Sequence, residues 1–233
     1  MIYQHRLIVA REGRLEKRHE AFELGAMNML EQHGSQLIGA WEVLVGPDAG
    51  SSVYQIRQFE NLTAWSQHQA KVRNDTVQVS RRAESLYTTV DLTDTAILQM
   101  HPLSPSLPAD WPPLPTQSDN SRAVFQQQTI WIRPADTNSH YSTYFNDVLP
   151  ALNICGSTHL SYFETLIGPG STNGASHRSV ELRRFPNATA WEEWIDIQRS
   201  DPALRKLVRQ DWYRTISRID SVLMKPMKYS RMR

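Results

Sequence analysis

The sequence has a single cysteine, Cys155, among its 233 residues. One cysteine excludes an internal disulfide and any zinc or iron–sulfur site built from several cysteines, and it is typical of a reducing compartment. The chain also lacks an excess of charge, since 25 Lys and Arg against 24 Asp and Glu give a formal charge of +1. We therefore expect a cytoplasmic protein without a nucleic-acid partner.

Long hydrophobic runs and metal-binding spacings are missing as well. No stretch approaches the ~18 consecutive apolar residues of a membrane span, and the first residues lack the apolar core of a signal peptide. The sequence has no His-x-x-x-His, no Cys-x-x-Cys and no carboxylate-rich calcium loop. We expect no membrane span, no metal and no cofactor.

An internal repeat organises what is present. Glu42-Val-Leu-Val-Gly-Pro47 recurs as Glu164-Thr-Leu-Ile-Gly-Pro169, and Phe59-Glu-Asn-Leu-Thr-Ala-Trp65 recurs as Phe185-Pro-Asn-Ala-Thr-Ala-Trp191. The second copy has four more residues in the loop after its Gly-Pro pair. Near the ends of the copies, Met100-His-Pro resembles Met224-Lys-Pro.

A proline-rich segment separates the copies and is expected to be an extended connector. We predict a first repeat at 1–102, a linker at 103–122 and a second repeat at 123–233.

Hydrophobic periodicity predicts the same order of elements, βαββαβ, in each repeat. Each repeat begins with a strand and one amphipathic helix that ends at a glycine, followed by a hairpin. A long helix capped by Asn61 or Asn187 and a closing strand complete it. The expected strands are 2–10, 36–45, 52–59 and 91–101, then 124–132, 158–167, 179–185 and 219–227, and the longest helices are 62–87 and 188–217.

This order is that of a ferredoxin-like unit, in which both helices cover one face of an antiparallel sheet. The other face would remain bare. We therefore predict an α+β fold in which two ferredoxin-like repeats close into one pseudo-dimeric α+β barrel with a pocket inside. The minimal folded unit would be one chain, and further homodimerisation is left open.

Several of these motifs resemble the NIPSNAP family, within the dimeric α+β barrel superfamily. They are the opening Met1-Ile-Tyr3, the run Gly39-Ala-Trp41-Glu-Val-Leu-Val-Gly46-Pro47, Arg57-Gln-Phe59 and the closing Met100-His-Pro102-Leu-Ser-Pro105. The resemblance implies a barrel whose pocket lies inside. Where the family commonly has a histidine on the third strand, this sequence has Gln55 and Glu181.

Side chains that point into the barrel are the candidates for chemistry. On the third strand of each repeat, Tyr54/Ile56 and Val180/Leu182 are suited to packing under helices, which would send their neighbours inward. A carboxylate beside a guanidinium could serve as general base with a substrate-orienting cation, or form a structural ion pair. The inward residues would be Gln55, Arg57, Glu181 and Arg183.

Histidines are the other acid–base candidates. His19, His33 and His68 lie on apolar helix stripes and are expected to be structural, and His140 opens a helix and is expected to be solvated. Three histidines without counterparts in the other repeat, together with Glu181, are the predicted catalytic groups: His5, His159 and His177.

Two further features could line a pocket. Glu42 and Glu164 occupy equivalent places and form a carboxylate pair if they point inward, or rim contacts if they do not. Strand aromatics such as Trp41 and Tyr162 could bind an apolar ligand or simply fill the core. The predicted substrate-binding residues are Arg183, Arg57, Gln55, Trp41, Tyr162 and Glu164.

These features favour a small-molecule enzyme that uses cofactor-independent acid–base chemistry, namely oxygenation, isomerisation or cyclisation, on a hydrophobic substrate in the barrel. One alternative is a non-catalytic ligand-binding or scaffold protein with the same barrel. Another is a haem-binding barrel with a histidine ligand, which the resemblance also allows.

Overall fold

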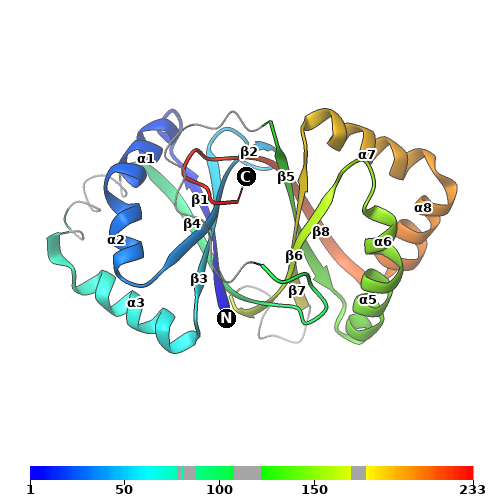
Figure 1. The fold of residues 1–233 in the computed structure, drawn as a ribbon, viewed down its shortest axis with the longest axis horizontal. Helices are drawn as coiled ribbons and strands as arrows, with labels where there is room; N and C mark the ends of the chain where they lie inside the picture. Colours follow the sequence, from blue (N-terminus) through cyan, green and yellow to red (C-terminus); the bar gives the residue numbers. More distant parts are fainter. Residues whose placement is uncertain (78–79, 81–87, 108–121, 169–176, 233) are drawn as a thin grey trace. The chain divides into compact units, whose positions relative to one another are not determined.

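The computed structural model describes residues 1–77, 80, 88–107, 122–168 and 177–232. They form two compact units, shown in Figure 1. Unit 1 contains residues 1–98 with the C-terminal residues 225–232, and unit 2 contains the described residues from 99 to 224. The repeat boundaries at 102 and 123 remain a prediction, and residues 108–121 of the predicted linker, with Trp111, lie outside the described residues.

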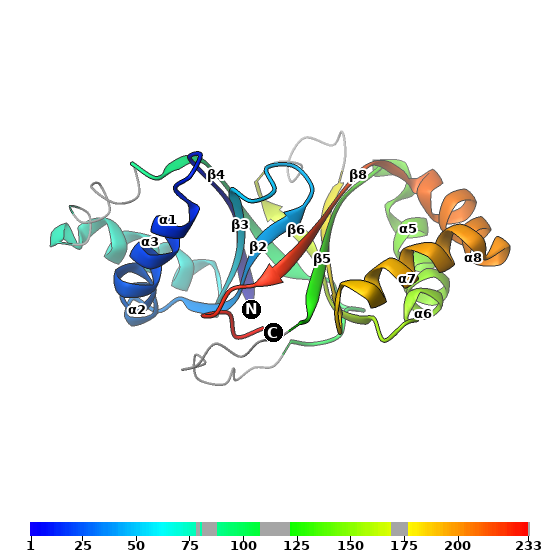
Figure 2. The same cartoon turned by 90° about the horizontal axis from the view of Figure 1, so that it is seen from above.

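Unit 1 is a four-stranded antiparallel sheet in the order β4-β1-β3-β2, with its helices on one face (Figures 1 and 2). Its elements are β1 (Ile2–Ala10), α1 (Leu15–Ala21), η1 (Phe22–Ala26), α2 (Met27–Gln32), β2 (Gln36–Val45), β3 (Ser52–Phe59), α3 (Leu62–Asn74) and β4 (Val90–Met100).

Unit 2 repeats this plan in the strand order β6-β7-β5-β8. Its elements are β5 (Val124–Ile132), η2 (Pro134–Asp136), α5 (Thr137–Thr143), η3 (Tyr144–Val148), α6 (Leu149–Leu152), β6 (Thr158–Ile167), β7 (His177–Phe185), α7 (Ala188–Ser200), α8 (Pro202–Lys206), η4 (Leu207–Trp212), η5 (Tyr213–Thr215) and β8 (Ile216–Pro226). The predicted α+β fold of two ferredoxin-like repeats is confirmed.

Equivalent residues of the two repeats are 122 positions apart before the β6–β7 loop and 126 positions apart after it. Thus β6 begins 122 residues after β2, whereas β8 begins and ends 126 residues after β4. The sequence comparison of Met100 with Met224 was therefore wrong by two residues, and Met100 corresponds to Pro226. Residues 169–176, which hold the longer loop, lie outside the described residues.

The first helix of each repeat is not an unbroken α-helix. Its middle is a π-helical turn, Phe22–Ala26 in unit 1 and Tyr144–Val148 in unit 2. Such turns are rare in α-helices and frequently occur at functional sites. They bring Phe22 and Tyr144, which are both buried, over the sheet at equivalent places.

The second helix of each repeat is also interrupted. In unit 2, α7 ends before Asp201, whose Oδ1 accepts hydrogen bonds from the backbone N–H groups of Ala203 (2.8 Å) and Leu204 (3.0 Å), so that a new helix begins at Pro202. In unit 1, α3 ends at Asn74, and most of the remaining predicted helix, residues 78–79 and 81–87, lies outside the described residues. The prediction of single helices at 62–87 and 188–217 was therefore wrong.

A short strap follows the last strand of each repeat and is held by the same hydrogen bonds in both units. In unit 2, the Tyr162 N–H donates to Ser104 Oγ (2.8 Å) and the His101 N–H donates to the Tyr162 carbonyl (2.9 Å). In unit 1, the Ala40 N–H donates to Ser230 Oγ (3.1 Å) and the Met227 N–H to the Ala40 carbonyl (2.9 Å). The C-terminal strap, residues 227–232, is thus part of the core of unit 1.

The predicted asparagine caps are confirmed. Asn61 Oδ1 accepts from the Ala64 N–H and Asn187 Oδ1 accepts from the Ala190 N–H, each at 2.9 Å. Replacing either asparagine with alanine should lower the free energy of unfolding by about 1 kcal/mol, because a helix N–H loses its partner. Urea denaturation measures this, and Asn138→Ala, at an exposed position of α5, is the control. Equal losses in all three variants would contradict the capping role.

Candidate functional site

A buried cluster of ionisable side chains lies between the sheet and the helices of unit 2. Glu181 Oε1 lies 3.2 Å from Arg183 Nη2 and 3.9 Å from His159 Nε2. All three side chains are at most 3% exposed, and Tyr144 is fully buried beside them. We call Tyr144, His159, Glu181 and Arg183 the acid–base cluster.

The local fold explains how these residues meet. Glu181 and Arg183 alternate with apolar residues along β7 and therefore share one face of the sheet. His159 lies opposite Arg183 on β6, just before a register shift that also places Tyr162 opposite Glu181. Tyr144 enters from above, on the π-helical turn.

Arg183 is fixed by the end of the first helix. Its Nη1 donates to the Leu152 carbonyl (3.2 Å), Asn153 Oδ1 (2.9 Å) and Ser157 Oγ (3.1 Å). Its guanidinium also lies 5.6 Å from the centre of the Trp194 ring. Carbonyls at a helix end carry partial negative charge, so this position suits a cation. Arg183 in turn fixes Glu181.

The predicted orientation of the third strands was wrong. Arg57 Nη1 donates to Ser35 Oγ (2.8 Å) after the first helix of unit 1, and Gln55 lines a crevice with His19 of α1. Glu181 and Arg183 take the equivalent positions in unit 2. All four residues therefore lie beneath the helices, and by alternation Tyr54, Ile56, Val180 and Leu182 occupy the opposite face.

A second group of polar side chains continues the layer. His140 is fully buried: its Nδ1 lies 2.7 Å from Thr215 Oγ1 and its Nε2 lies 2.9 Å from the Tyr162 hydroxyl. The expectation that His140 is solvated was wrong, because the first turn of its helix packs on the segment around Thr215. The Tyr144 ring lies 4.8 Å from Tyr162 and 5.4 Å from Trp212, so the layer is largely aromatic.

Glu164 and His177 lie at the edge of the same face. His177 Nε2 is 3.6 Å from Glu164 Oε1, and Gln99 Nε2 donates to Glu164 Oε2 (3.1 Å). The interaction with His177 is the main cause that lowers the pKa of Glu164 to about 2, and contacts with Tyr141 and Gln99 add to it. Glu42, its counterpart, forms an ion pair with Lys225 (3.0 Å).

Burial dominates the electrostatics of the layer. It lowers the pKa of His159 to about 4, although the charge of Glu181 opposes this, and it lowers the pKa of His140 to about 3. It raises the pKa values of Tyr144 and Tyr162 well above their usual range. At neutral pH both histidines are therefore uncharged and both phenols carry their protons.

His159 is the unusual member of this layer. Among the described residues, neither ring nitrogen finds a hydrogen-bond partner, although both are buried. Buried polar groups are normally satisfied, and leaving one unsatisfied costs about 1–3 kcal/mol. The neutral imidazole has a lone pair open to a hydrogen bond or a proton from a bound molecule, although burial makes it a weaker base than a solvent-exposed histidine.

Unit 1 does not have this chemistry at the equivalent positions. The 122- and 126-residue registers place Phe22, Leu37 and Gln55 where unit 2 has Tyr144, His159 and Glu181. Arg57 and Ser35 keep the contact that Arg183 makes with Ser157. The shared arginine therefore supports the fold of both units, and the acid–base groups occur in unit 2.

The predicted site residues thus divide between two faces. Glu181, Arg183, His159, Tyr162, Glu164 and His177 gather under the helices of unit 2, and Gln55 and Arg57 lie in the equivalent layer of unit 1. His5 and Trp41 lie on the opposite face of the unit 1 sheet, where the His5 ring stacks on Tyr54 at 5.2 Å. The catalytic and binding roles themselves remain predictions.

Sequence reasoning missed Tyr144 and His140 as members of the site. The available signal was the cluster of ring-bearing residues on one helix stripe, namely His140, Tyr141, Tyr144 and Phe145.

In the described part of the chain, no group of three or more His, Cys, Asp or Glu side chains is placed to hold a metal ion. None of the described helices is long and apolar enough to cross a bilayer.

We expect the free energy of unfolding to fall as the pH drops from about 6.5 to about 4. Folded His140 and His159 have lowered pKa values, whereas in the unfolded chain they bind protons near pH 6.5. Stability therefore rises with pH in this window, by roughly 1.4 kcal/mol per pH unit for each such histidine. From pH 4.5 to about 2, protonation of Glu164 lowers stability further.

Urea titrations at pH 7, 6 and 5 measure this dependence. The His159→Leu variant should show a shallower slope by one proton. A wild-type slope that this substitution leaves unchanged would contradict the assignment of the lowered pKa to His159.

Two solved structures resemble nearly the whole chain in fold. A candidate monooxygenase of Fusobacterium nucleatum superposes with a TM-score of 0.60 at 10% identity, over 97% of this chain and 91% of that chain. An anthrone oxidase-like protein does so with a TM-score of 0.59 at 13% identity, over 97% and 91%. These likenesses show the fold alone: the chain is an α+β protein of the dimeric α+β barrel type.

The family follows from the sequence of the first repeat. Residues 3–105 match the NIPSNAP family and are a NIPSNAP domain, which confirms the predicted family over that part of the chain. A search of curated proteins finds no match to the sequence.

Proposed function

We propose that unit 2 catalyses a cofactor-independent oxidation of a hydrophobic, enolisable aromatic ketone by dioxygen. The observation that carries this proposal is His159, a buried, neutral imidazole without a hydrogen-bond partner among the described residues, 3.9 Å from the Glu181 carboxylate. The low-identity likeness to an anthrone oxidase-like protein and to candidate monooxygenases supports the choice of reaction class.

The acid–base cluster supplies the groups that such a reaction needs. His159 accepts a proton from the methylene carbon next to the substrate carbonyl, and the Glu181 carboxylate stabilises the imidazolium that forms. Tyr144 stays protonated, and its hydroxyl has no hydrogen-bond partner among the described residues, so it is the donor available to the enolate oxygen. The surrounding aromatic rings suit a polycyclic substrate.

The electrons then pass from the carbanion to dioxygen. A C–O bond forms to give a peroxide, and the imidazolium returns its proton to the outer oxygen. Loss of water breaks the O–O bond and the second C–H bond and leaves a new carbonyl. For anthrone, one dioxygen gives one anthraquinone and one water.

The chain as described is closed around this cluster, so the substrate must displace part of the helical layer. The π-helical turn that carries Tyr144 is the segment we expect to move, because it covers the cluster and because π-turns frequently occur at functional sites.

Anthrone oxidation tests the proposal. Purified protein and anthrone in a dioxygen electrode should consume one dioxygen for each anthraquinone formed, at a rate above the buffer background. An absorption spectrum of the protein beforehand is the control for bound haem or flavin. Saturable anthrone binding without turnover would contradict catalysis and support the binding-protein alternative.

Other parts of the prediction remain proposals too. On sequence grounds we place the reaction in the cytoplasm, because a lone cysteine favours a reducing compartment. Homodimerisation stays a prediction that sedimentation equilibrium can decide.

A further inference from the structure

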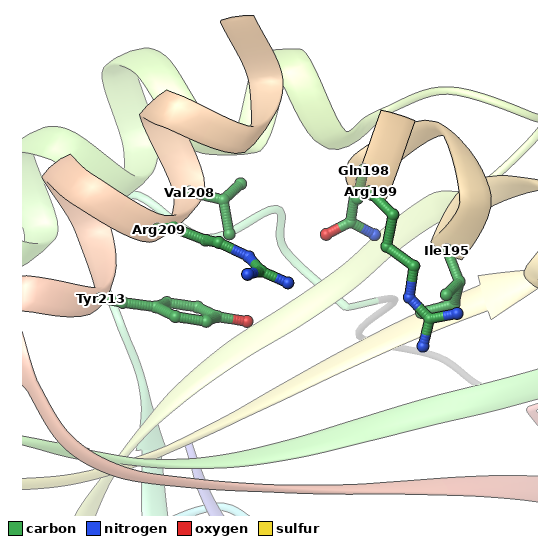
Figure 3. Close-up of a pocket in the computed structure, with 6 residues that line it drawn as sticks. All are labelled: Ile195, Gln198, Arg199, Val208, Arg209 and Tyr213. Atoms are coloured by element: carbon green, nitrogen blue, oxygen red, sulfur yellow. The ribbon is translucent and has the colours of Figure 1, made fainter. Parts of the chain in front are cut away.

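A cleft of about 410 Å³ opens on unit 2 between α7 and the helical segment that follows α8. Figure 3 shows three of its residues on α7 and three on η4 and η5. We call it the outer cleft; its lining residues are Ile195, Gln198, Arg199, Val208, Arg209 and Tyr213. Its volume lies within the range of small-molecule sites, roughly 300–1,000 Å³.

The floor of the outer cleft is apolar. Val208 is a buried member of the apolar core of unit 2, and Ile195 packs against that core. Tyr213, which is 38% exposed, adds an aromatic ring to the floor. The centre of this ring lies 5.3 Å from that of Trp212. A flat or acyl group can therefore make apolar contacts with this floor.

The polar groups of the cleft converge above the floor. In Figure 3 the Arg209 guanidinium, the Tyr213 hydroxyl and the Gln198 amide point toward one another, with Arg199 on the far side. Gln198 Nε2 donates to the Trp194 carbonyl (3.3 Å), which fixes the amide. Guanidinium and hydroxyl donors in this arrangement suit an anionic oxygen group.

On α7 the acidic residues Glu192, Glu193 and Asp196 outnumber the single basic residue, Arg199. The wall of the cleft that follows α7 is basic, because residues 201–214 hold four Lys and Arg against two Asp. One of those carboxylates, Asp201, already caps a helix. Among the described residues, no carboxylate lies within ion-pair distance of Arg209.

A second hollow of about 340 Å³ adjoins the first and shares Arg209 with it. Its other lining residues are Pro202, Arg205, Lys206 and Gln210. Arg209 therefore stands between an apolar-floored cleft and a basic one. An anion held by Arg209 would be attracted from both sides, and its apolar part would have room on one side only.

We propose that the outer cleft binds an amphipathic anion, with a planar or acyl body on the Ile195–Val208 floor and a carboxylate, sulfonate or phosphate at Arg209. The outer cleft shares no lining residue with the acid–base cluster, and the proposal does not depend on the proposed oxidation. The same chemistry could come from a free metabolite or from the headgroup of an anionic lipid.

Two fluorescent probes test the proposal because they differ in charge. 8-Anilinonaphthalene-1-sulfonate carries a sulfonate, and N-phenyl-1-naphthylamine has the same ring system without it. We expect Arg209→Gln to weaken binding of the sulfonate probe roughly 10-fold or more, as loss of a charge-assisted contact does, and to change binding of the neutral probe less than about twofold. Arg214→Gln, which removes the same charge from an exposed residue outside the cleft, is the matched control.

Four results would overturn the proposal. The first is an unchanged affinity of Arg209→Gln for the sulfonate probe, the second an equal loss of affinity in Arg214→Gln, and the third an equal loss of affinity for the neutral probe. Circular dichroism checks that Arg209→Gln is folded. If it is not, Arg199→Gln takes its place, and the fourth result is an unchanged affinity of folded Arg199→Gln for the sulfonate probe. Sedimentation with phosphatidylglycerol vesicles, and with phosphatidylcholine vesicles as control, identifies the source. Arg209-dependent sedimentation with the anionic vesicles assigns the site to lipid headgroups, and its absence beside probe binding assigns it to a free anion.

Discussion

Replacing His159 with leucine should lower the rate of anthrone oxidation by about 10²–10⁴-fold, the usual effect of losing a general acid–base group. The same change should leave the free energy of unfolding unchanged or raise it. The reason is that the imidazole is buried without a hydrogen bond among the described residues, whereas leucine satisfies an apolar site and already occupies the equivalent position, Leu37, in unit 1.

This combination of effects separates catalysis from structure. A substitution at a residue with only a structural role lowers activity and stability together. Turnover and urea denaturation are therefore both measured. His33→Gln is the matched control, because His33 is a half-buried histidine of unit 1 whose partner is Asp75. Full activity in His159→Leu would rule out His159 as the base and with it the proposed mechanism.

Replacing Tyr229 with alanine should lower the free energy of unfolding by about 3–5 kcal/mol, as for other buried aromatic side chains. Tyr229 is 3% exposed, its ring lies 5.2 Å from Phe22 and its hydroxyl lies 3.1 Å from His19 Nδ1. The change therefore opens a cavity in the core of unit 1 and leaves the half-buried His19 without this contact.

The corresponding position in unit 2 provides the control. Leu103 lies 126 residues before Tyr229 but is 60% exposed, so Leu103→Ala should change stability by less than about 0.5 kcal/mol. Urea denaturation of both variants gives the comparison. A loss below about 1 kcal/mol for Tyr229→Ala would mean that the C-terminal strap is not part of the cooperative core.

The sequence predicted the element order well because the repeat supplied two independent readings of it. The Gly-Pro turns and the asparagine caps are local signals, and they placed β2, β3 and the beginning of α3, with their counterparts, within a few residues. Asp201-Pro202 is also a local signal, a cap followed by proline at the first helical position, and it could have been used to end α7. The π-turns have no comparable signature.

The faces of the sheets could not be predicted by alternation alone. Gln55 and Ile56 are 1% and 0% exposed, so both faces of β3 are buried and polarity does not distinguish them. His140 was misjudged for a related reason. Its partner Thr215 lies 75 residues away, and no pattern near His140 indicates a contact at that separation.

The π-turns allow the history of the chain to be ordered. A π-turn contains one residue more than the α-helical turn it replaces, and η1 and η3 hold theirs 122 residues apart, at the same point of both repeats. One insertion before the duplication accounts for both. The four-residue difference between the β2–β3 and β6–β7 loops distinguishes the two repeats, so it arose after the duplication. Single-repeat relatives that descend from the same ancestor should therefore keep the π-turn.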